Sequence, residues 1–283
     1  MGMKMNEILK KNKGITLIEL LVALAISGLL VAALYRTFIG QQKTYVAQDQ
    51  VVDMQQNMRV AISRMMGDIR MTGFGNVSMV LPVTFTGGTF NNILNPNTPV
   101  SDSLTLVTSL NTPATLTTSG SIGQNQIVVS TLTDSQGNAL FDTGNRRYIS
   151  VGGLESYIIT SVNNGTSTIT LNGSLTYNHP FGTPVFTIRA ITYQVADMAG
   201  IPTLLRNENI GDGNQPQADY IENLQFAYFD DSGILTANPL NMRLVQVTLT
   251  ARTGSQDPEL ARVGDGFRRR QIASNIHLRN MGI

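Results

Sequence analysis

The N-terminal part of the chain combines a long apolar run with a longer helical pattern. Residues 15–34 form an apolar run of 20 residues that contains a single charged side chain, Glu19. At about 1.5 Å per residue, a helix of this length reaches about 30 Å, the hydrocarbon thickness of a bilayer. The run therefore predicts the transmembrane half of a helix, over residues 15–35.

The helical period continues beyond the apolar run. Apolar residues recur mostly at intervals of three, four or seven, and glutamine-rich polar positions lie between them. The apolar positions are Tyr35, Phe38, Tyr45, Val52, Met58, Ile62, Met65 and Ile69. No proline precedes Pro82. We predict one helix over about 15–71, in which residues 36–72 are an amphipathic stem packed on a head and Gly73 and Gly75 end the helix.

Residues 73–283 are expected to form a β-rich extracytoplasmic head. Residues 75–100 lack a period and suggest a long surface loop. Strand-like runs follow at Ser103–Ser109, Gln126–Leu132, Tyr157–Val162, Thr166–Leu171, Val185–Val195, Thr203–Arg206, Ile221–Asp230 and Arg243–Arg252. Asn163-Asn164-Gly165 is a strong hairpin signal. The predicted fold class is α+β: a long N-terminal helix packed on an antiparallel β-sheet head, with a β-rich insertion at about 110–180.

Charge is distributed unevenly between the leader and the rest of the chain. Residues 1–14 hold four Lys and one Glu, whereas the remainder holds 16 basic and 18 acidic residues. A basic segment before an apolar run stays cytoplasmic, which places the bulk of the chain outside. The nearly neutral head argues against nucleic-acid binding. With no Cys and two His, disulfide, thiol and zinc chemistry are excluded.

Glu19 is the first candidate functional residue. A carboxylate inside a membrane span costs a few kcal/mol and is a functional candidate by default. It follows a glycine at the boundary between polar and apolar residues, in the segment Lys-Gly-Ile-Thr-Leu-Ile-Glu-Leu-Leu-Val at 13–22. This arrangement resembles the cleavage and polymerisation signal of type IV pilins and of type II secretion pseudopilins. Two alternatives remain, a secretory signal peptide cut after Ala25 and a plain signal anchor, but neither accounts for Glu19.

The resemblance implies specific partners and processing. Prepilin peptidase would cut between Gly14 and Ile15 and methylate the new amine of Ile15. Glu19 would then pair with the α-amine of a neighbouring subunit and so guide subunit assembly. The implied partners are the peptidase, other minor pilins, the major pilin and inner-membrane lipid, without a small-molecule substrate. The implied location is the bacterial inner membrane, single-pass with a cytoplasmic N-terminus, and then an extracellular pilus.

Three further segments resemble the PilW family of minor pilins, the counterpart of secretion pseudopilin J. They are residues 63–75 at the end of the stem, residues 219–230, and the C-terminal stretch with Arg268-Arg269-Arg270 and His277-Leu278-Arg279-Asn280. Thr72 departs from the alanine common in that family. The resemblance implies a structural protein, not an enzyme, that primes a filament and sits at its tip. The alternatives are a J-like pseudopilin, a tip adhesin whose insertion recognises a surface or sugar, and an unrelated anchored periplasmic protein.

The stem offers further contact residues. Arg64 and Asp68 are spaced i, i+4 for a helical ion pair, and Arg70 lies beside them; together they are also candidates for an intersubunit contact. Arg268–Arg270 favour a solvated turn or contact with an acidic neighbouring subunit over contact with DNA phosphates or membrane headgroups. His179 is expected in a turn and His277 stands alone, without a nucleophile motif near either.

Three acidic, Gly-rich loops have the composition of turns, with calcium as the alternative. They are Asp134–Asp142, Asn209–Asn214 and Asp230–Gly233. None matches the full calcium-binding loop with its terminal Glu. We therefore expect no cofactor and keep calcium as an open alternative.

Overall fold

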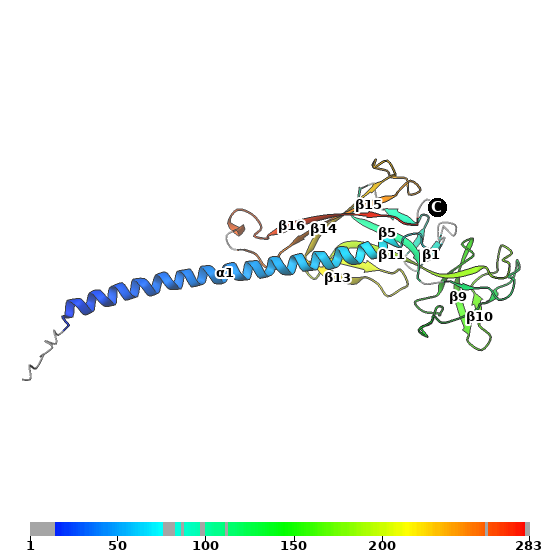
Figure 1. Cartoon of the computed structure of the whole chain (residues 1–283), viewed down its shortest axis with the longest axis horizontal. Coiled ribbons are helices and arrows are strands. Elements are labelled where there is room, and N and C mark those ends of the chain that lie inside the picture. Colours follow the sequence, from blue (N-terminus) through cyan, green and yellow to red (C-terminus); the bar gives the residue numbers. More distant parts are fainter. Residues whose placement is uncertain are drawn as a thin grey trace, which may run out of the picture. The chain divides into compact units, whose positions relative to one another are not determined.

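A computed structural model describes residues 15–75, 83–85, 88–96, 100–110, 113–257 and 260–280 (Figure 1). The chain divides into two compact units, Met1–Gln50 and Val51–Ile283, and each is described by itself. Helix α1, Leu17–Arg70, is 54 residues long and contributes to both units. The predicted long helix and the α+β fold class are confirmed. Gly14, on the amino side of the expected cleavage point, lies outside the described residues.

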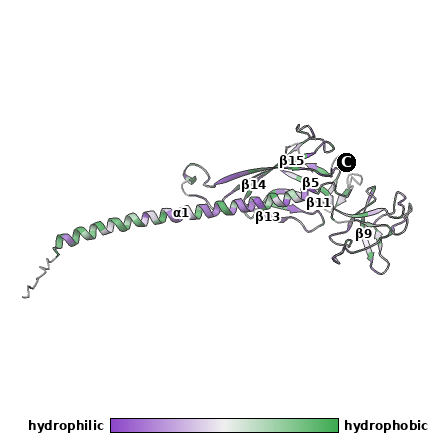
Figure 2. Cartoon of the chain, viewed as in Figure 1, coloured by the Kyte–Doolittle hydropathy of each residue, from purple (hydrophilic) through white to green (hydrophobic). Residues whose placement is uncertain are grey.

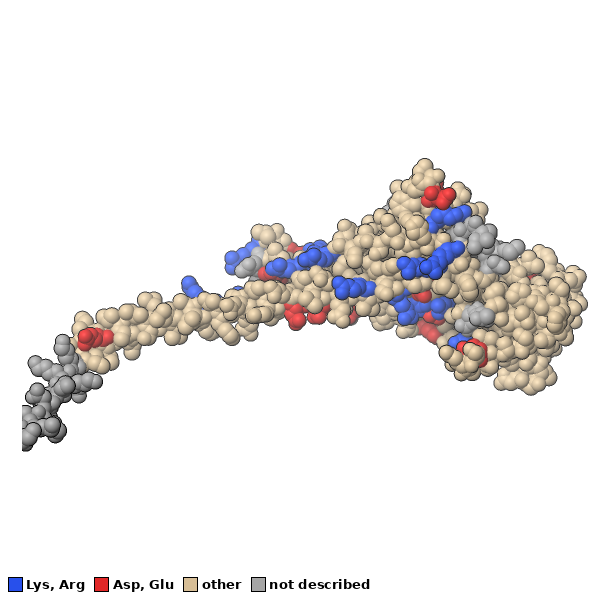
Figure 3. Space-filling view, viewed as in Figure 1, with Lys and Arg blue, Asp and Glu red and all other residues tan. Residues whose placement is uncertain are grey.

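In the first unit, α1 is long and apolar enough to cross a membrane by length and composition. Its large side chains are exposed, including Leu17 at 78%, Leu24 at 70% and Leu34 at 69%. Figure 2 shows this stretch mostly green, and Figure 3 shows it almost free of charge apart from one acidic group near its start. An apolar surface of this extent is stable in lipid or against other apolar helices rather than in water.

In the second unit, α1 buries one face against the head. The buried residues are Met54, Met58, Ala61, Ile62, Met65 and Ile69, spaced as one stripe of a helix. This confirms the last four positions of the predicted stripe. The prediction that Val52 belongs to this stripe is wrong, because Val52 is 57% exposed and Met54 is buried instead.

Two sheets provide the surfaces on which this helix face packs. The four-stranded antiparallel sheet has the order β16-β15-β14-β4. Its strands are β4 (Val100–Ser101), β14 (Ile221–Phe229), β15 (Leu244–Arg252) and β16 (Arg269–His277). In β15, every second residue from Val245 to Ala251 is buried, which is the period-two pattern expected from the sequence. The short 3-10 helix η2 (Leu260–Arg262) precedes β16.

A larger sheet of ten strands is organised around β11 (Pro184–Met198). Beside β11 lie β5 (Ser103–Ser109), β12 (Ile201–Asn207), β6 (Ala114–Thr115) and β8 (Tyr148–Val151). The remaining strands are β3 (Leu94–Pro96), β7 (Gln126–Val128), β9 (Glu155–Asn163), β10 (Thr168–Leu171) and β13 (Gln215–Asp219). The hairpin predicted at Asn163-Asn164-Gly165 joins the antiparallel pair β9 and β10.

Strand β11 serves two hydrophobic cores. From Ile188 onward it pairs with β5 and from Thr192 with β12, where Ile191 and Tyr193 join the core built on α1. Its first residues pair with β6 and β8. There Val185 joins a separate core made of Ala114, Leu116, Ile127, Val129, Leu140, Phe141, Ile149, Val151, Ile159, Ile169, Leu171 and Leu175. The expected insertion region thus holds strands with a core of their own.

A third core corrects one prediction. Residues 75–100 do not form only a surface loop, because β1 (Val83–Phe85) and β2 (Gly88–Phe90) pair there and β3 and β4 join the larger sheets. Phe85 is 3% exposed and its ring centroid lies 4.6 Å from that of Tyr148. The short strands, of two or three residues each, are too brief to show a period in the sequence.

Candidate functional site

The N-terminal end of α1 is closed by a capping box between Thr16 and Glu19. The backbone N–H and the hydroxyl of Thr16 each donate to Oε2 of Glu19 at 2.9 Å. The backbone N–H of Glu19 donates back to Oγ1 of Thr16 at 3.3 Å. These bonds satisfy donors that the first turn of a helix leaves open. We did not predict this pair, although the spacing Thr-x-x-Glu was its signal in the sequence.

Only one of the two carboxylate oxygens of Glu19 takes part in the capping box. All three contacts involve Oε2 or the backbone, and within the described residues no donor reaches Oε1. The neighbouring side chains Leu17, Ile18 and Leu20 are apolar and at least 60% exposed. A carboxylate in apolar surroundings needs a charged partner or a full set of donors. Among the residues that the structure describes, Oε1 of Glu19 thus has no hydrogen-bond donor.

Asp68, predicted as a stem contact, binds the head of its own chain. Its Oδ2 accepts a 2.9 Å hydrogen bond from Nε of Arg206 and a 2.7 Å bond from the hydroxyl of Tyr193. Arg189 lies 3.9 Å from Oδ1, and Glu208 accepts from both arginines. Burial, followed by the charge of Asp68, raises the pKa of Tyr193, so its hydroxyl stays a donor.

The prediction of a helical ion pair between Arg64 and Asp68 is wrong. In the described part of the chain, the ion pairs of Asp68 are with Arg206 and Arg189. Arg64 and Arg70 lie on the exposed side of the stem. Asp68 lies at the border of the buried stripe, three residues after the buried Met65, and is half-buried, whereas Arg64 is exposed. Arg64 and Arg70 thus remain candidates for contacts with other subunits, whereas the carboxylate of Asp68 binds residues of its own chain.

The C-terminal end of α1 is held by residues distant in sequence. Asn280 donates from Nδ2 to the carbonyl oxygen of Thr72 at 3.2 Å, and the Thr108 hydroxyl donates to that of Met71 at 2.5 Å. The N–H of Gly73, at a φ of 75°, donates to Val107. These bonds satisfy carbonyl groups left open at a helix end. The Arg–Asn ending noticed in the sequence therefore has a structural role through Asn280.

The prediction of a solvated turn at the three consecutive arginines is also wrong. Arg269 opens strand β16, so a strand begins where a turn was expected. Arg268 donates to Asp257 at 2.6 Å, and Arg269 donates to Glu222 at 2.6 Å and also to Asp265. Two of the three charges are thus neutralised by acids of the same chain.

His179 bridges to Gly120 directly before the turn at 180–183, and its side chain is buried inside the insertion. It is 1% exposed, and its Nε2 lies 2.6 Å from Oε1 of Glu155. Oε2 of Glu155 accepts from the hydroxyl of Tyr157 at 2.7 Å and from the N–H of Thr176 at 2.9 Å. Burial acts to raise the pKa of Glu155, but the hydrogen bonds from Thr176, Tyr157 and His179 outweigh it and the pKa is lowered. His277, at the end of β16, is exposed.

The acidic loops use their carboxylates to hold turns. Asp134 accepts from the N–H groups of Gln136 and Asn138, and Asp230 accepts from those of Ser232 and Ile234. These bonds are the Asx type of turn. Within the described residues, no group of three or more His, Cys, Asp or Glu could hold a metal ion. Calcium would have to compete with the backbone donors already bound.

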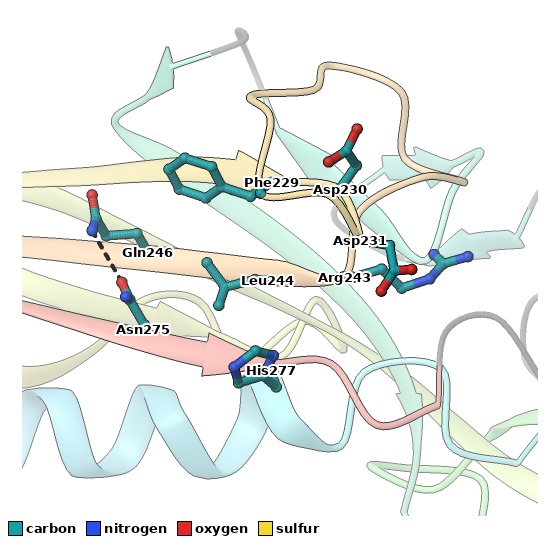
Figure 4. A pocket seen from close by; sticks show the side chains of 9 residues that line it. Phe229, Asp230, Asp231, Arg243, Leu244, Gln246, Asn275 and His277 are labelled. Carbon is teal, nitrogen blue, oxygen red and sulfur yellow. Dashed lines mark hydrogen bonds between the residues drawn. The ribbon is translucent and has the colours of Figure 1, made fainter.

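A surface hollow lies beside the third of these loops (Figure 4). Phe229, Leu244 and His277 line it together with Asp230, Asp231, Gly233, Arg243, Gln246 and Asn275. Gln246 donates to Asn275 at 3.0 Å, and Arg243 donates to the carbonyl of Leu240 at 2.9 Å. The polar groups that line the hollow thus largely bond within the chain, and the lining does not point to a particular ligand.

The comparisons with known proteins bear on the first of these features. Residues 9–35 match the prokaryotic N-terminal methylation motif. This segment contains Gly14, Ile15, Thr16 and Glu19. The chain is similar to the type IV-like pilin TTHA1219 from Thermus thermophilus, at 9% identity and a TM-score of 0.34, over 81% of this chain and 98% of that one. No curated protein sequence matches significantly.

Proposed function

We propose that this chain is a filament subunit of the type IV pilin and pseudopilin class. The match of residues 9–35 to the methylation motif is the observation that carries this proposal. The capping box supports it, because Glu19 is held at the start of α1 with one oxygen open to an ammonium. In this proposal the leader is cut after Gly14, the amine of Ile15 is methylated, and that amine pairs with Glu19 of the next subunit.

We further propose that the chain is a minor pilin of the PilW kind. It is stored in the inner membrane with a cytoplasmic N-terminus, helps to prime assembly, and sits at the filament tip with other minor pilins. The bulk of the head supports this, because a large unit with three cores is hard to repeat in a tightly packed filament. Immunogold labelling confined to filament ends is expected, and uniform labelling would contradict a tip position.

Mass spectrometry of the mature N-terminus tests the central step. We expect a chain that begins at Ile15 and carries one methyl group. The Gly14→Val variant should remain uncut, because the protease needs close approach of its backbone to that of the substrate. A mature wild-type chain that retains its leader, or one cut after Ala25, would refute the proposal.

A tip adhesin is a second candidate that one observation favours. The segment between β5 and β11 has its own buried core, as expected of an added binding module. A strain whose chain lacks this segment should then keep its filaments and lose attachment. The J-like pseudopilin alternative is tested by deleting the gene and measuring secretion against piliation.

A further inference from the structure

Strand β16 forms one edge of the four-stranded sheet. It pairs with β15 in an unbroken register from Leu244↔His277 to Arg252↔Arg269. The N–H of Leu278 donates to Arg243, and the N–H of Thr253 donates to Arg268. Because bonding alternates along an antiparallel pair, the even-numbered residues of β16 bond to β15 and the odd-numbered residues direct their N–H and C=O groups outward. The outward residues are Arg269, Gln271, Ala273, Asn275 and His277.

The other described sheet edges are shorter or interrupted. Strand β13 contains Pro216 and a register shift against β12, and β4 and β7 span two and three residues. Proline, bulges, short length and charged side chains keep an edge from pairing with another chain, and in β16 the charged residues are confined to Arg269 and Arg270 at its start. Strand β16 has nine residues, no proline and no register shift. All five outward residues are exposed.

One face of this strand is incompletely covered. Ile276 and Ile272 both point to the side of β16 that packs on the core, where their partners Val245 and Leu249 are buried. Ile276 is 1% exposed, whereas Ile272 is 39% exposed. Arg270, two residues further along the same face, is exposed. Unlike Arg269, it forms no ion pair within the described chain. One exposed apolar side chain, Ile272, therefore lies beside the positive charge of Arg270 on this face.

We propose that β16 receives an extended segment of a different filament subunit as a fifth strand of this sheet. This rests on the proposed function as a pilin-class subunit. The incoming strand bonds to the outward groups of Gln271, Ala273 and Asn275, as in other strand-addition complexes. On the core side it presents an apolar residue to Ile272 and an Asp or Glu to Arg270. Its outer side is polar, matching Gln271 and Asn275.

A second copy of this chain does not fit the edge. The incoming strand must place an Asp or Glu opposite Arg270. Strand β16 contains no Asp or Glu, so a second β16 cannot supply this acid, and the partner segment comes from another protein. The absence of cysteine makes this testable with the single-cysteine variant Ala273→Cys. A disulfide-linked dimer of this variant in cells would overturn the choice of partner.

Proline at position 273 tests the edge directly. Ala273→Pro removes an outward N–H and leaves the β15 ladder intact, since the bonding residues are even-numbered. In the full-length chain we expect at least a tenfold smaller fraction in sheared filaments, with an unchanged amount in the membrane. Ala273→Val keeps the N–H and should assemble like wild type. Equal assembly of the proline and valine variants would overturn the proposal.

The charge and the folding are tested separately. Arg270→Glu should reduce incorporation several-fold, whereas Arg262→Glu, at an exposed position outside β16, should not. In purified wild-type filaments, the amides of Gln271 and Ala273 should exchange with deuterium at least tenfold more slowly than in the membrane-extracted chain. Unchanged exchange would refute strand addition even if the proline variant misfolds. Methylated Ile15 in the same samples shows that the proposed function stands when the strand proposal fails.

Discussion

The Asp68 carboxylate near the end of α1 accepts a 2.9 Å hydrogen bond from Nε of Arg206, 138 residues later in the chain. Arg206 lies on β12 and its side chain is 5% exposed. Tyr193 on β11 donates to the same carboxylate oxygen. One acidic residue of the stem thus satisfies two buried donors from the central strands of the larger sheet.

Asp68→Asn should destabilise the head by about 3 kcal/mol. Removing one member of a buried pair leaves the other charge without compensation, which costs about 3–5 kcal/mol when burial is complete. Asp68 is 14% exposed, so we expect the lower end of this range. Urea unfolding of the full chain in detergent, followed by near-ultraviolet circular dichroism, measures the change.

The matched control is Asp53→Asn on the exposed side of the same helix. A surface substitution of this kind should change the free energy of unfolding by less than about 0.5 kcal/mol. Equal losses in the two variants would mean that the Asp68 contacts contribute nothing specific. Arg64→Ala should resemble the control, because Asp68 does not depend on Arg64.

The Glu155 and His179 pair should make the insertion acid-sensitive. The pKa of Glu155 is lowered in the folded state, so its ionised form stabilises folding above its ordinary pKa of 4.5. That contribution is lost as the pH falls through the lower folded pKa. We expect the free energy of unfolding to fall between about pH 5 and pH 3, and to fall less in Glu155→Gln.

The difference between wild type and Glu155→Gln isolates this residue from the other acids. At neutral pH the variant should lose about 1–3 kcal/mol, because a buried partner is left unsatisfied. Asp231→Asn, which removes an exposed carboxylate, is the control. Parallel pH profiles for wild type and Glu155→Gln would contradict the prediction.

Two substitutions of Glu19 separate helix capping from subunit pairing. Glutamine still accepts the Thr16 hydrogen bonds of a capping box, whereas alanine accepts none. If Glu19 binds an amine of the next subunit, both variants should be cut and methylated normally and both should lose at least tenfold in filament incorporation. Quantitative immunoblotting of sheared filaments measures this. Normal assembly of Glu19→Gln with failure of Glu19→Ala would assign the residue to capping alone.

Removal of residues 115–184 should leave the core around α1 folded. Ala114 and Val185 are register partners, so a two-residue Asn-Gly turn can join the cut ends. The lost packing should be that of the third core, because Phe85 packs there on Tyr148, which is removed. We expect a cooperative unfolding transition with a lower midpoint. A chain that is degraded in the membrane would show that the two cores are interdependent.

The elements with a long, regular period were predictable from sequence. Helix α1 and strand β15 begin and end within two residues of the predicted positions, because each presents a clear period of burial. The hairpin at Asn163-Asn164-Gly165 was visible in its turn residues. The four short strands before residue 102 were not, since two or three residues carry no period.

Strand β16 was missed for a different reason. Only Ile276 among its residues is fully buried, so exposed side chains on both faces hide the alternation of buried and exposed positions.

The long-range polar contacts could not be predicted from the sequence either. Nothing near Asp68 in sequence points to Arg206, and the i, i+4 spacing favoured Arg64 instead. The Glu155 and His179 pair spans 24 residues and depends on how the insertion folds.

Strand β11 has a mechanical consequence for any subunit held at a filament end. Its first residues belong to the insertion, and its later residues are bonded on both sides, to β5 and to β12. A pull on the insertion along this strand acts on those two ladders in shear, so many hydrogen bonds resist together instead of opening one at a time. Tension taken up by the insertion would therefore pass into the sheet that holds Asp68 of the stem through Tyr193 and Arg206.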